Sequence, residues 1–256
     1  MKLYGLIGFP LGHSFSAKFF NEKFSREGID AEYRNFELED FGDFMELLAE
    51  LPDLAGVNVT IPYKQAVMPY LTAVSPQAQA IGAVNTVRIG RTADGDITAI
   101  EGFNTDAPAF ARTLAPLLPV EAVSALVLGT GGASKAVCYA LEQLGIDYQL
   151  VSRTAAPGRL TYGDLTPQVV ADNRVIINTT PVGMSPATDA CPDIPYDGLT
   201  PDHVCYDLIY NPAETLFLQK AAANGASTKN GLDMLRLQAL LAWKIWNSPF
   251  KLKVKS

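Results

Sequence analysis

A glycine-rich loop in the middle of the chain limits the possible folds more than any other feature. It follows a short continuous apolar run, Ala125–Leu128, and precedes a helical pattern, Ala133–Leu144. Such a run is typical of a buried parallel strand. Glycines between a strand and a helix let the backbone approach a pyrophosphate, whose charge rests on the helix N-terminus. The sequence therefore predicts a dinucleotide-binding βαβ unit, with a loop formed by Gly129, Thr130, Gly131, Gly132 and Ala133.

The residues after the next predicted strand, Tyr148–Val151, bear on the type of dinucleotide. An NAD site places Asp or Glu there to hold the ribose 2′-hydroxyl, but this chain has Ser152, Arg153 and Thr154. The planar donor fork of an arginine suits a 2′-phosphate. The alternative is that Arg153 is a surface cation at the end of a strand. The pattern favours NADP over NAD.

Short apolar strands alternate with helical patterns along the chain, which predicts an α/β protein with largely parallel sheets. Helical spacing also predicts a helix over Tyr63–Leu71, and an Asp94-Gly95 turn predicts an edge hairpin over residues 83–100. A second unit is predicted to begin near Thr105. The other predicted strands are Leu3–Phe9, Glu32–Leu38, Gly56–Ile61, Val175–Asn178 and Val204–Leu208, and the other helices are Ser16–Arg26, Phe41–Leu51, Asp106–Leu118, Gln77–Ile81 and Leu232–Trp246.

Composition excludes several classes of protein. Of the 256 residues, 48% are hydrophobic and 18% are charged, which is incompatible with intrinsic disorder. The net charge of −7 disfavours a nucleic-acid partner. No apolar run approaches the roughly 18 residues of a membrane span. Three widely spaced cysteines without a CxxC motif favour neither a disulfide framework nor a zinc site, so we expect a cytoplasmic protein without a metal.

Three polar clusters lie where strands of the N-terminal part end. Each residue taken singly has a structural interpretation: Ser16 or Asp106 as a helix N-cap, Lys64 as a solvated lysine, and Asn85 as a turn residue. Gln238 lies within the apolar stripe of the last predicted helix, where it either is a hydrogen-bonded core residue or faces a polar ligand. Taken singly, none of these residues indicates a function.

Taken together, the clusters belong to a set of motifs that spans nearly the whole chain. They are Ser14-x-Ser16, Asn58-Val59-Thr60-x-Pro62-x-Lys64, Gly82-Ala83-x-Asn85-Thr86, Asn104-Thr105-Asp106, the loop Gly129–Ala136, Asn178-x-Thr180-x-x-Gly183-Met184, Tyr206-Asp207-Leu208-x-Tyr210 and Asn230-Gly231-x-x-Met234-Leu235-x-x-Gln238. In these motifs and in their order, the chain resembles the shikimate dehydrogenase family.

The resemblance implies two domains. An α/β substrate-binding and catalytic domain would comprise residues 1–104 and 231–256, completed by the C-terminal helix. A Rossmann-like parallel-sheet domain that binds NADP would comprise residues 105–230. The implied reaction is the reversible reduction of 3-dehydroshikimate to shikimate with NADPH, in the chorismate pathway to aromatic amino acids. Small-molecule ligands, no nucleic acid or membrane partner, and a monomer or homodimer are expected.

The resemblance also implies a role for each motif residue. Lys64 and Asp106 would carry catalysis. The serine hydroxyls of Ser14 and Ser16 would bind the substrate carboxylate with help from Tyr210. Ring hydroxyls or the carboxylate end would contact Thr60, Asn85 and Gln238. The cofactor would contact the glycine loop, the segment 152–154, and backbone positions at Leu208 and Gly231.

One segment departs from the family pattern, and two alternatives stay open. The family usually places a helix after the arginine motif, but residues 155–160 are too short and too interrupted by Pro157 and Gly158 for one. We therefore expect a more open adenine side, with Arg159 as the one nearby second cation. The alternatives are a quinate/shikimate dehydrogenase that uses NAD, and a non-catalytic ligand-binding relative.

Overall fold

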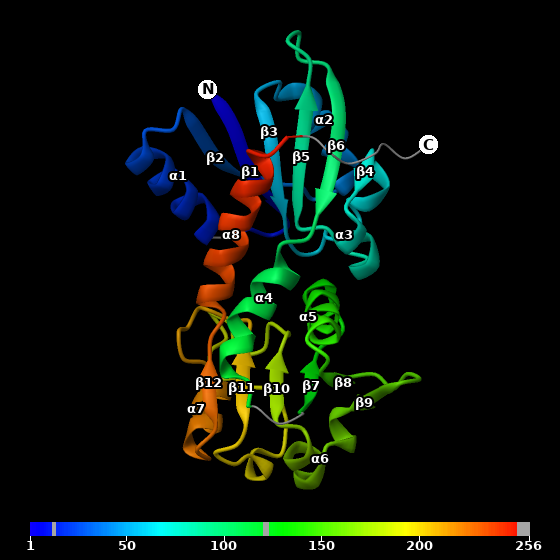
Figure 1. The fold of residues 1–256 in the computed structure, drawn as a ribbon, viewed down its shortest axis with the longest axis vertical. Helices are drawn as coiled ribbons and strands as arrows, with labels where there is room; N and C mark the ends of the chain where they lie inside the picture. Colours follow the sequence, from blue (N-terminus) through cyan, green and yellow to red (C-terminus); the bar gives the residue numbers. More distant parts are fainter. Residues whose placement is uncertain (12–13, 120–122, 250–256) are drawn as a thin grey trace. The chain divides into compact units, whose positions relative to one another are not determined.

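The computed structural model describes residues 1–11, 14–119 and 123–249. The chain divides into two compact units, Met1–Thr105 with Ala239–Ser256 and Asp106–Gln238, which are called the N-terminal unit and the central unit below. Within the described residues each unit contains one six-stranded sheet (Figure 1). The predicted α/β class is confirmed.

The sheet of the N-terminal unit is mixed, in the order β2-β1-β3-β5-β6-β4. Strand β1 is parallel to β2 and β3, whereas β5 is antiparallel to β3 and β6. The short β4 pairs with β6, so the predicted edge position of the β5–β6 hairpin is wrong. The strands are β1 (Lys2–Gly8), β2 (Ala31–Glu37), β3 (Leu54–Val59), β4 (Ala73–Val74), β5 (Thr86–Arg91) and β6 (Ile97–Phe103).

Helix α1 (Phe15–Glu27) and the C-terminal part of α8 (Leu232–Trp246) pack on one face of this sheet. Their contact is an aromatic cluster that includes Phe20, Tyr33 and Trp246. The ring of Phe20 stacks on Tyr33, with 4.7 Å between centroids, and Tyr4 stacks on Trp246 at 4.8 Å. Large buried rings contribute much of the apolar area that holds a helix on a sheet.

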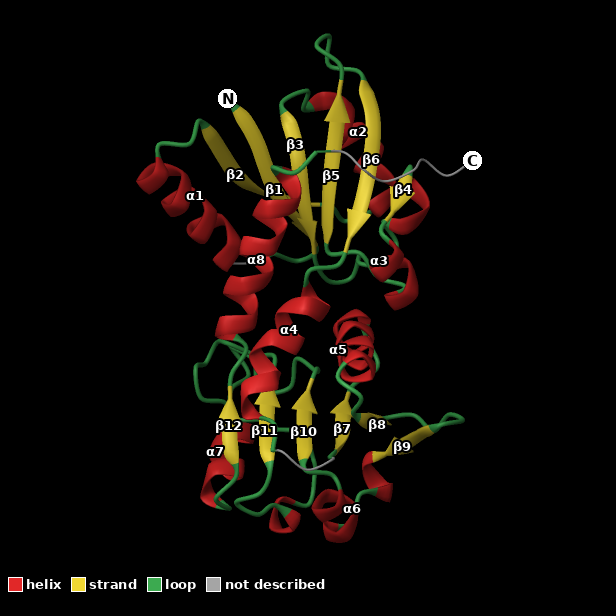
Figure 2. Ribbon diagram, viewed as in Figure 1, coloured by secondary structure: helices red, strands yellow, loops and turns green. Residues whose placement is uncertain are grey.

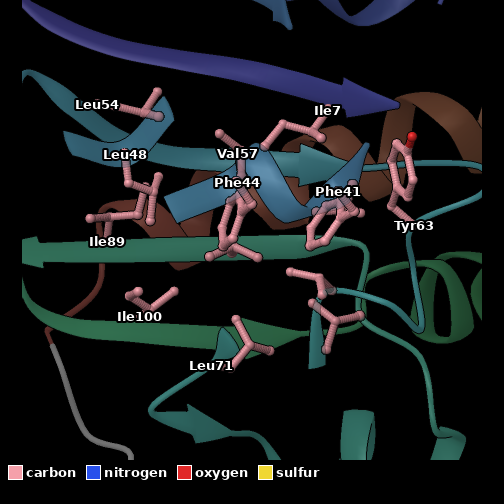
Figure 3. Close-up of a cluster of buried hydrophobic side chains, with 14 of the residues drawn as sticks. Ile7, Phe41, Phe44, Leu48, Leu54, Val57, Tyr63, Leu71, Ile89 and Ile100 are labelled. Carbon is pink, nitrogen blue, oxygen red and sulfur yellow. The ribbon is translucent and has the colours of Figure 1, made fainter. Parts of the chain in front are cut away.

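The opposite face of the sheet carries a second buried cluster (Figure 3). The 3₁₀-helix η1 (Phe41–Asp43) and helix α2 (Phe44–Glu50) supply Phe41, Phe44 and Leu48 to it. The predicted helix Tyr63–Leu71 is wrong, because this segment forms turns and the 3₁₀-helix η2 (Met68–Tyr70). Pro69 lacks the amide hydrogen that a helix interior needs. Helix α3 (Pro76–Ile81) follows.

The sheet of the central unit is parallel throughout, in the order β12-β11-β10-β7-β8-β9 (Figure 2). Its register places Leu128, Asn178 and Asp207 side by side at the carboxyl ends of three neighbouring strands. Ligands of open α/β sheets bind at this edge. The strands are β7 (Ser124–Leu128), β8 (Asp147–Ser152), β9 (Arg159–Thr161), β10 (Val175–Asn178), β11 (Val204–Asp207) and β12 (Ser227–Lys229).

Helices cover both faces of this sheet, as parallel sheets require. Helix α4 packs beside α5, and Phe110 of α4 contacts Tyr206 of β11 edge to face. Side chains of α6 and α7 fill the core of the other face. The helical elements are α4 (Asp106–Leu114), η3 (Ala115–Leu117), α5 (Gly132–Gln143), η4 (Tyr162–Asp164), α6 (Pro167–Asp172), η5 (Tyr196–Gly198) and α7 (Leu216–Ala223).

The connection from β8 to β9 contains no helix, which agrees with the expectation from the short segment 155–160. The strand that follows still forms, and its Arg159 pairs with Leu150 of β8. Among the described residues, no helix is both long and apolar enough to cross a membrane.

Candidate functional site

The glycine loop lies between β7 and α5, as the sequence predicts. Gly129 has φ +109°, a conformation that side-chain-bearing residues rarely adopt, and a Cβ there would lie 2.7 Å from the Thr179 hydroxyl oxygen. Gly131 is the N-cap of α5 and provides no side-chain cap for the helix amides. Amides at such a terminus bind anions. Because Gly129 has no side chain to keep a ligand away from the backbone, and because the first amides of α5 have no side-chain cap, this loop fits a pyrophosphate.

The proposed 2′-phosphate end lies after β8. The Ser152 hydroxyl accepts the amide of Thr154 at 3.2 Å, which turns the chain at Arg153. Arg153 is exposed and, among the described residues, has no carboxylate within ion-pair distance. Burial raises the pKa of Tyr162, and the Arg153 charge acts against that rise, so the two side chains are neighbours. An exposed guanidinium at the end of this strand fits a phosphate. Arg159 is exposed as well.

Two predicted cofactor residues, Leu208 and Gly231, lie against each other. A Cβ at Gly231 would lie 2.0 Å from the carbonyl oxygen of Leu208, so only glycine fits there. The Gly231 amide donates to the carbonyl of Ile209 at 3.0 Å, and the Leu208 amide donates to the carbonyl of Asn178 at 3.0 Å. The Leu208–Ile209 turn is therefore tied both to the end of β10 and to the start of α8.

A buried carboxylate beneath this turn was not assigned a role from the sequence. Asp207 is 0% exposed, and its Oδ1 accepts the Ile209 amide at 3.0 Å and the Asn178 Nδ2 at 3.1 Å. Its Oδ2 accepts the Thr215 hydroxyl at 2.6 Å. Burial raises the pKa of Asp207 to about 6, although these three hydrogen bonds lower it. The signal that could have found it is an Asn and an Asp that end two neighbouring parallel strands.

In the N-terminal unit, the two serines have different local roles. Ser14 is the N-cap of α1, and its hydroxyl accepts the Ala17 amide at 3.3 Å. Ser16 is buried in the first turn and hydrogen-bonds to the hydroxyl of Tyr33. The sequence suggested Ser16 as the possible N-cap, but the structure gives that role to Ser14. Because Ser16 follows by two positions, α1 sets the direction of both hydroxyls.

Tyr33 extends this contact into a buried hydrogen-bond chain. Its hydroxyl donates to Asn58 Oδ1 at 2.9 Å, and Asn58 Nδ2 donates to the Asn85 carbonyl and the Thr86 hydroxyl, both at 3.3 Å. The side-chain amide of Asn58 can have only this orientation, because the Asn85 carbonyl is an acceptor and must face the Nδ2 group of Asn58, not its Oδ1. This hydrogen-bond chain connects Ser16 on α1 with Asn85, whose backbone pairs with the ends of β3 and β6.

Asn85 and its neighbour Val84 fix the backbone near both predicted catalytic residues. The Val84 amide donates to the carbonyl of Lys64 at 2.7 Å. Asn85 Oδ1 accepts the amide of Thr105, the residue before Asp106, at 2.8 Å. Lys64 and Thr60 are half-buried, on the turn after β3. Two successive residues thus hold the main chain at Lys64 and at Thr105.

The remaining predicted residues belong to the central unit. Asp106 is buried at the first position of α4. Tyr210 is half-buried, and burial raises its pKa above the ordinary value. Gln238 is buried, and its Nε2 donates to the Leu235 carbonyl at 3.0 Å. Within the described parts of the chain, no three His, Cys, Asp or Glu residues gather in a way that could hold a metal ion.

Comparison with known proteins gives these residues a family. Residues 6–87 match the family model described as the shikimate dehydrogenase substrate binding domain. The shikimate dehydrogenase (NADP(+)) of Carboxydothermus hydrogenoformans is 37% identical, over 96% of this chain and 91% of that protein. The chain belongs to the shikimate dehydrogenase family.

Solved structures agree with this membership. The shikimate dehydrogenase of Aquifex aeolicus has a TM-score of 0.84 and 37% identity, over 96% of this chain and 92% of that one. The Thermus thermophilus enzyme, solved with NADP(H) and shikimate, has 0.83 and 32%, over 96% and 94%. The quinate dehydrogenase of Corynebacterium glutamicum, solved with NAD, has 0.82 and 31%, over 96% and 93%. Similarity of fold therefore does not separate the two cofactors.

Proposed function

We propose that this protein catalyses the reversible NADPH-dependent reduction of 3-dehydroshikimate to shikimate, in the chorismate pathway to aromatic amino acids. The observation that carries this proposal is membership of the shikimate dehydrogenase family together with the presence of both Lys64 and Asp106. A relative that only binds a ligand has no need to keep an acid–base pair.

The choice of NADP is supported by the residues around the central sheet. The Gly129 turn and the uncapped start of α5 fit a pyrophosphate, and the exposed Arg153 fits a 2′-phosphate. We propose that Ser152 and Thr154 flank that phosphate and that Leu208 and Gly231 line the nicotinamide.

Bound NADPH would supply the hydride that reduces the ring ketone. Lys64 would donate a proton to the developing alkoxide, or stabilise the negative charge on its oxygen. Asp106 would bind the same hydroxyl and keep the lysine charged. Ser14, Ser16 and Tyr210 would bind the carboxylate, and Thr60, Asn85 and Gln238 would bind ring hydroxyls or the carboxylate end.

We assign substrate binding to the N-terminal unit and cofactor binding to the central unit. The match of residues 6–87 to a substrate-binding model supports the first assignment, and the parallel sheet with its glycine loop supports the second. A cytoplasmic location is proposed because Cys138, Cys191 and Cys205 are all free thiols. A small-molecule substrate and a monomer or homodimer complete the proposal.

The first test measures NADP reduction by absorbance when shikimate is added, with Lys64→Ala beside the wild type. Turnover should fall by about two to four orders of magnitude, the usual contribution of a positioned acid–base group. Shikimate binding should be retained better than turnover. Lys18→Ala removes an exposed lysine of α1 and is the matched control. Near-normal turnover of Lys64→Ala at neutral pH would contradict the assigned role.

The second test concerns the cofactor. Arg153→Ala should raise the KM for NADP by about ten- to a hundredfold and leave that for NAD nearly unchanged, since NAD has no 2′-phosphate. Arg159→Ala, at the neighbouring exposed cation, should have a smaller effect. Equal losses with both cofactors would indicate a structural role for Arg153. Turnover of quinate with NAD but not of shikimate with NADP would favour the quinate dehydrogenase alternative.

A further inference from the structure

The carboxyl edge of the central sheet contains one contact network that reaches from the glycine loop to the Leu208–Ile209 turn. Thr179 follows β10, and both its amide and its hydroxyl donate to the carbonyl of Leu128, directly before the loop. The same Thr179 hydroxyl lies beside Gly129, at the distance that excludes a Cβ. The end of β10 therefore supports the first turn of the loop.

Asn178, at the last position of β10, organises the residues that follow it. Its Oδ1 accepts the Thr180 amide at 3.0 Å and the Thr180 hydroxyl at 2.6 Å. The Thr180 hydroxyl in turn accepts the Val182 amide at 3.2 Å. Because Asn178 Oδ1 is committed to these donors, its Nδ2 faces two acceptors, Asp207 Oδ1 at 3.1 Å and the Val182 carbonyl at 3.4 Å.

Asp207 joins this segment to two others. Its carboxylate also receives the amide of Ile209 and the hydroxyl of Thr215, which is the N-cap of α7. All three partners are neutral donors, which suits an ionised carboxylate, because such a group only accepts. One buried charge thus holds together the end of β10, the turn after β11 and the start of α7.

We propose that Asp207 is a positioning residue of the cofactor site, where its carboxylate holds the Leu208–Ile209 turn and the 178–182 segment in the geometry that binds the nicotinamide end. This inference rests on the proposed function, because it takes Leu208 and Gly231 to line the nicotinamide. Asp207 acts through those backbone positions and is itself 0% exposed.

The state of the carboxylate makes the role measurable. Burial raises the pKa of Asp207 to about 6, so the charge is lost in mildly acidic solution. Other titratable groups on this side of the sheet include Tyr196 of η5, Cys191 and Cys205, and burial is the main cause that raises the pKa of Tyr196. His203, directly before β11, is buried as well, and its ring hydrogen-bonds to Thr200 and to the carbonyl of Val170 in α6. Burial raises the pKa of Cys205 to about 12, so its thiol is uncharged at the pH at which Asp207 titrates.

The test uses Asp207→Asn, which keeps the shape of the side chain and removes its charge. NADPH binding is followed by its fluorescence, and the dissociation constant should rise about tenfold at pH 7.5, since charge-assisted hydrogen bonds are about twice as strong as neutral ones. The difference from wild type should shrink as the pH falls to 5.5, where wild-type Asp207 is protonated too. Shikimate affinity should not change.

Two further variants separate positioning from general damage. Thr215→Val removes one donor to the carboxylate and should give a smaller loss of NADPH affinity, and Thr215→Ser should retain it. Tyr206→Phe is the matched control, because it deletes the hydrogen bond of a neighbouring buried residue to Thr113, on the face that α4 covers. This control should leave the NADPH dissociation constant and its pH profile unchanged.

Hydrogen exchange tests the network without any ligand. In Asp207→Asn the amide of Ile209 should exchange about tenfold faster at pH 7.5, and in Tyr206→Phe it should not. Unchanged exchange at Ile209 in folded Asp207→Asn, or unchanged NADPH affinity at pH 7.5, would overturn the positioning role. A wild-type protein that binds no NADPH, but shows the faster exchange in the variant, would instead contradict the proposed function and leave the positioning of the turn supported.

Discussion

The two units bury a carboxylate in opposite ways. In the N-terminal unit, Glu101 is 2% exposed and faces Arg88 directly across the β5–β6 pair. Arg88 Nε donates to its Oε2 at 2.9 Å, and the Nη2 of the same guanidinium also bonds it. In the central unit, Asp207 has only neutral donors around it. The first charge is compensated by an ion of opposite sign, whereas the second is compensated by dipoles alone.

The difference follows from what each carboxylate holds. Arg88 also donates through Nη1 to the Ile245 carbonyl at 3.0 Å and to the Ser248 hydroxyl at 2.9 Å, so the ion pair fixes the end of α8 on the sheet. A guanidinium carries its charge at every pH of interest, so Arg88 always supplies the positive partner of this contact. Asp207 lies at the carboxyl edge of the parallel sheet, the edge at which open α/β sheets bind their ligands. The Arg88–Glu101 ion pair anchors a helix. Asp207, which has hydrogen-bond donors but no cationic partner among the described residues, can instead lose its charge as the pH falls.

The largest expected effect comes from breaking the permanent pair. Arg88→Met should lower the free energy of unfolding by about 3–5 kcal/mol, because it leaves Glu101 buried and uncompensated. Arg88→Met/Glu101→Leu should recover most of that loss, since an apolar pair of similar volume removes both charges. Urea denaturation measures both variants. A loss of less than about 1 kcal/mol in the single variant would show that the pair is not a strong anchor.

A pH series sharpens the comparison on the side of Asp207. Its folded pKa of about 6 exceeds the ordinary Asp value of 3.8, so the native state holds the proton more strongly than the unfolded chain does. Its contribution therefore favours the fold below about pH 4 and is lost as the pH rises through 6. The difference is about two pKa units, or about 3 kcal/mol.

Asp207→Asn cannot make that contribution. The free energy of unfolding of wild type minus that of the variant should fall by about 2 kcal/mol between pH 4 and pH 7, because part of the contribution is already lost at pH 4. Urea denaturation at each pH measures it, and subtraction removes the titration of all other groups. A difference that does not vary with pH would show that Asp207 keeps an ordinary pKa in the folded protein.

The smallest effect is expected from the neutral hydrogen-bond chain of the N-terminal unit. Tyr33→Phe removes one oxygen, leaves Asn58 Oδ1 without its donor and releases the Ser16 hydroxyl. Stability should fall by about 1–2 kcal/mol. The KM for shikimate should rise by about two- to fivefold at nearly constant kcat. The reason is that substrate binding must then order the released Ser16 hydroxyl, at a cost of about 0.4–1 kcal/mol.

Tyr4→Phe is the control for this variant, because Tyr4 belongs to the same aromatic cluster and is equally buried. It should leave the KM for shikimate unchanged. If both variants raised that KM equally, the effect would come from the aromatic packing and not from the hydroxyl of Tyr33.

The strands and long helices could be predicted because their patterns are local. The apolar runs locate β7, β8, β10 and β11, and the helical stripe gives the observed bounds of α8, Leu232–Trp246. The short elements β4, β9, β12, α6 and α7 were not predicted. These elements are short and, unlike β10 and β11, are not continuous apolar runs, so no local pattern marks them, and packing against the sheets stabilises them instead.

The sequence by itself determined the glycine loop, the arginine after β8 and the order of the family motifs, because each depends on residues that are adjacent in the chain. Only the tertiary structure decided which polar residues are buried together. Ser16, Tyr33 and Asn58 meet because α1, β2 and the end of β3 pack on one another. Asp207 meets Asn178 because two parallel strands end in register, and it meets Thr215 because α7 begins beside the end of β11. Burial and hydrogen-bond partners set the charge state of a carboxylate, and both depend on segments that are distant in sequence.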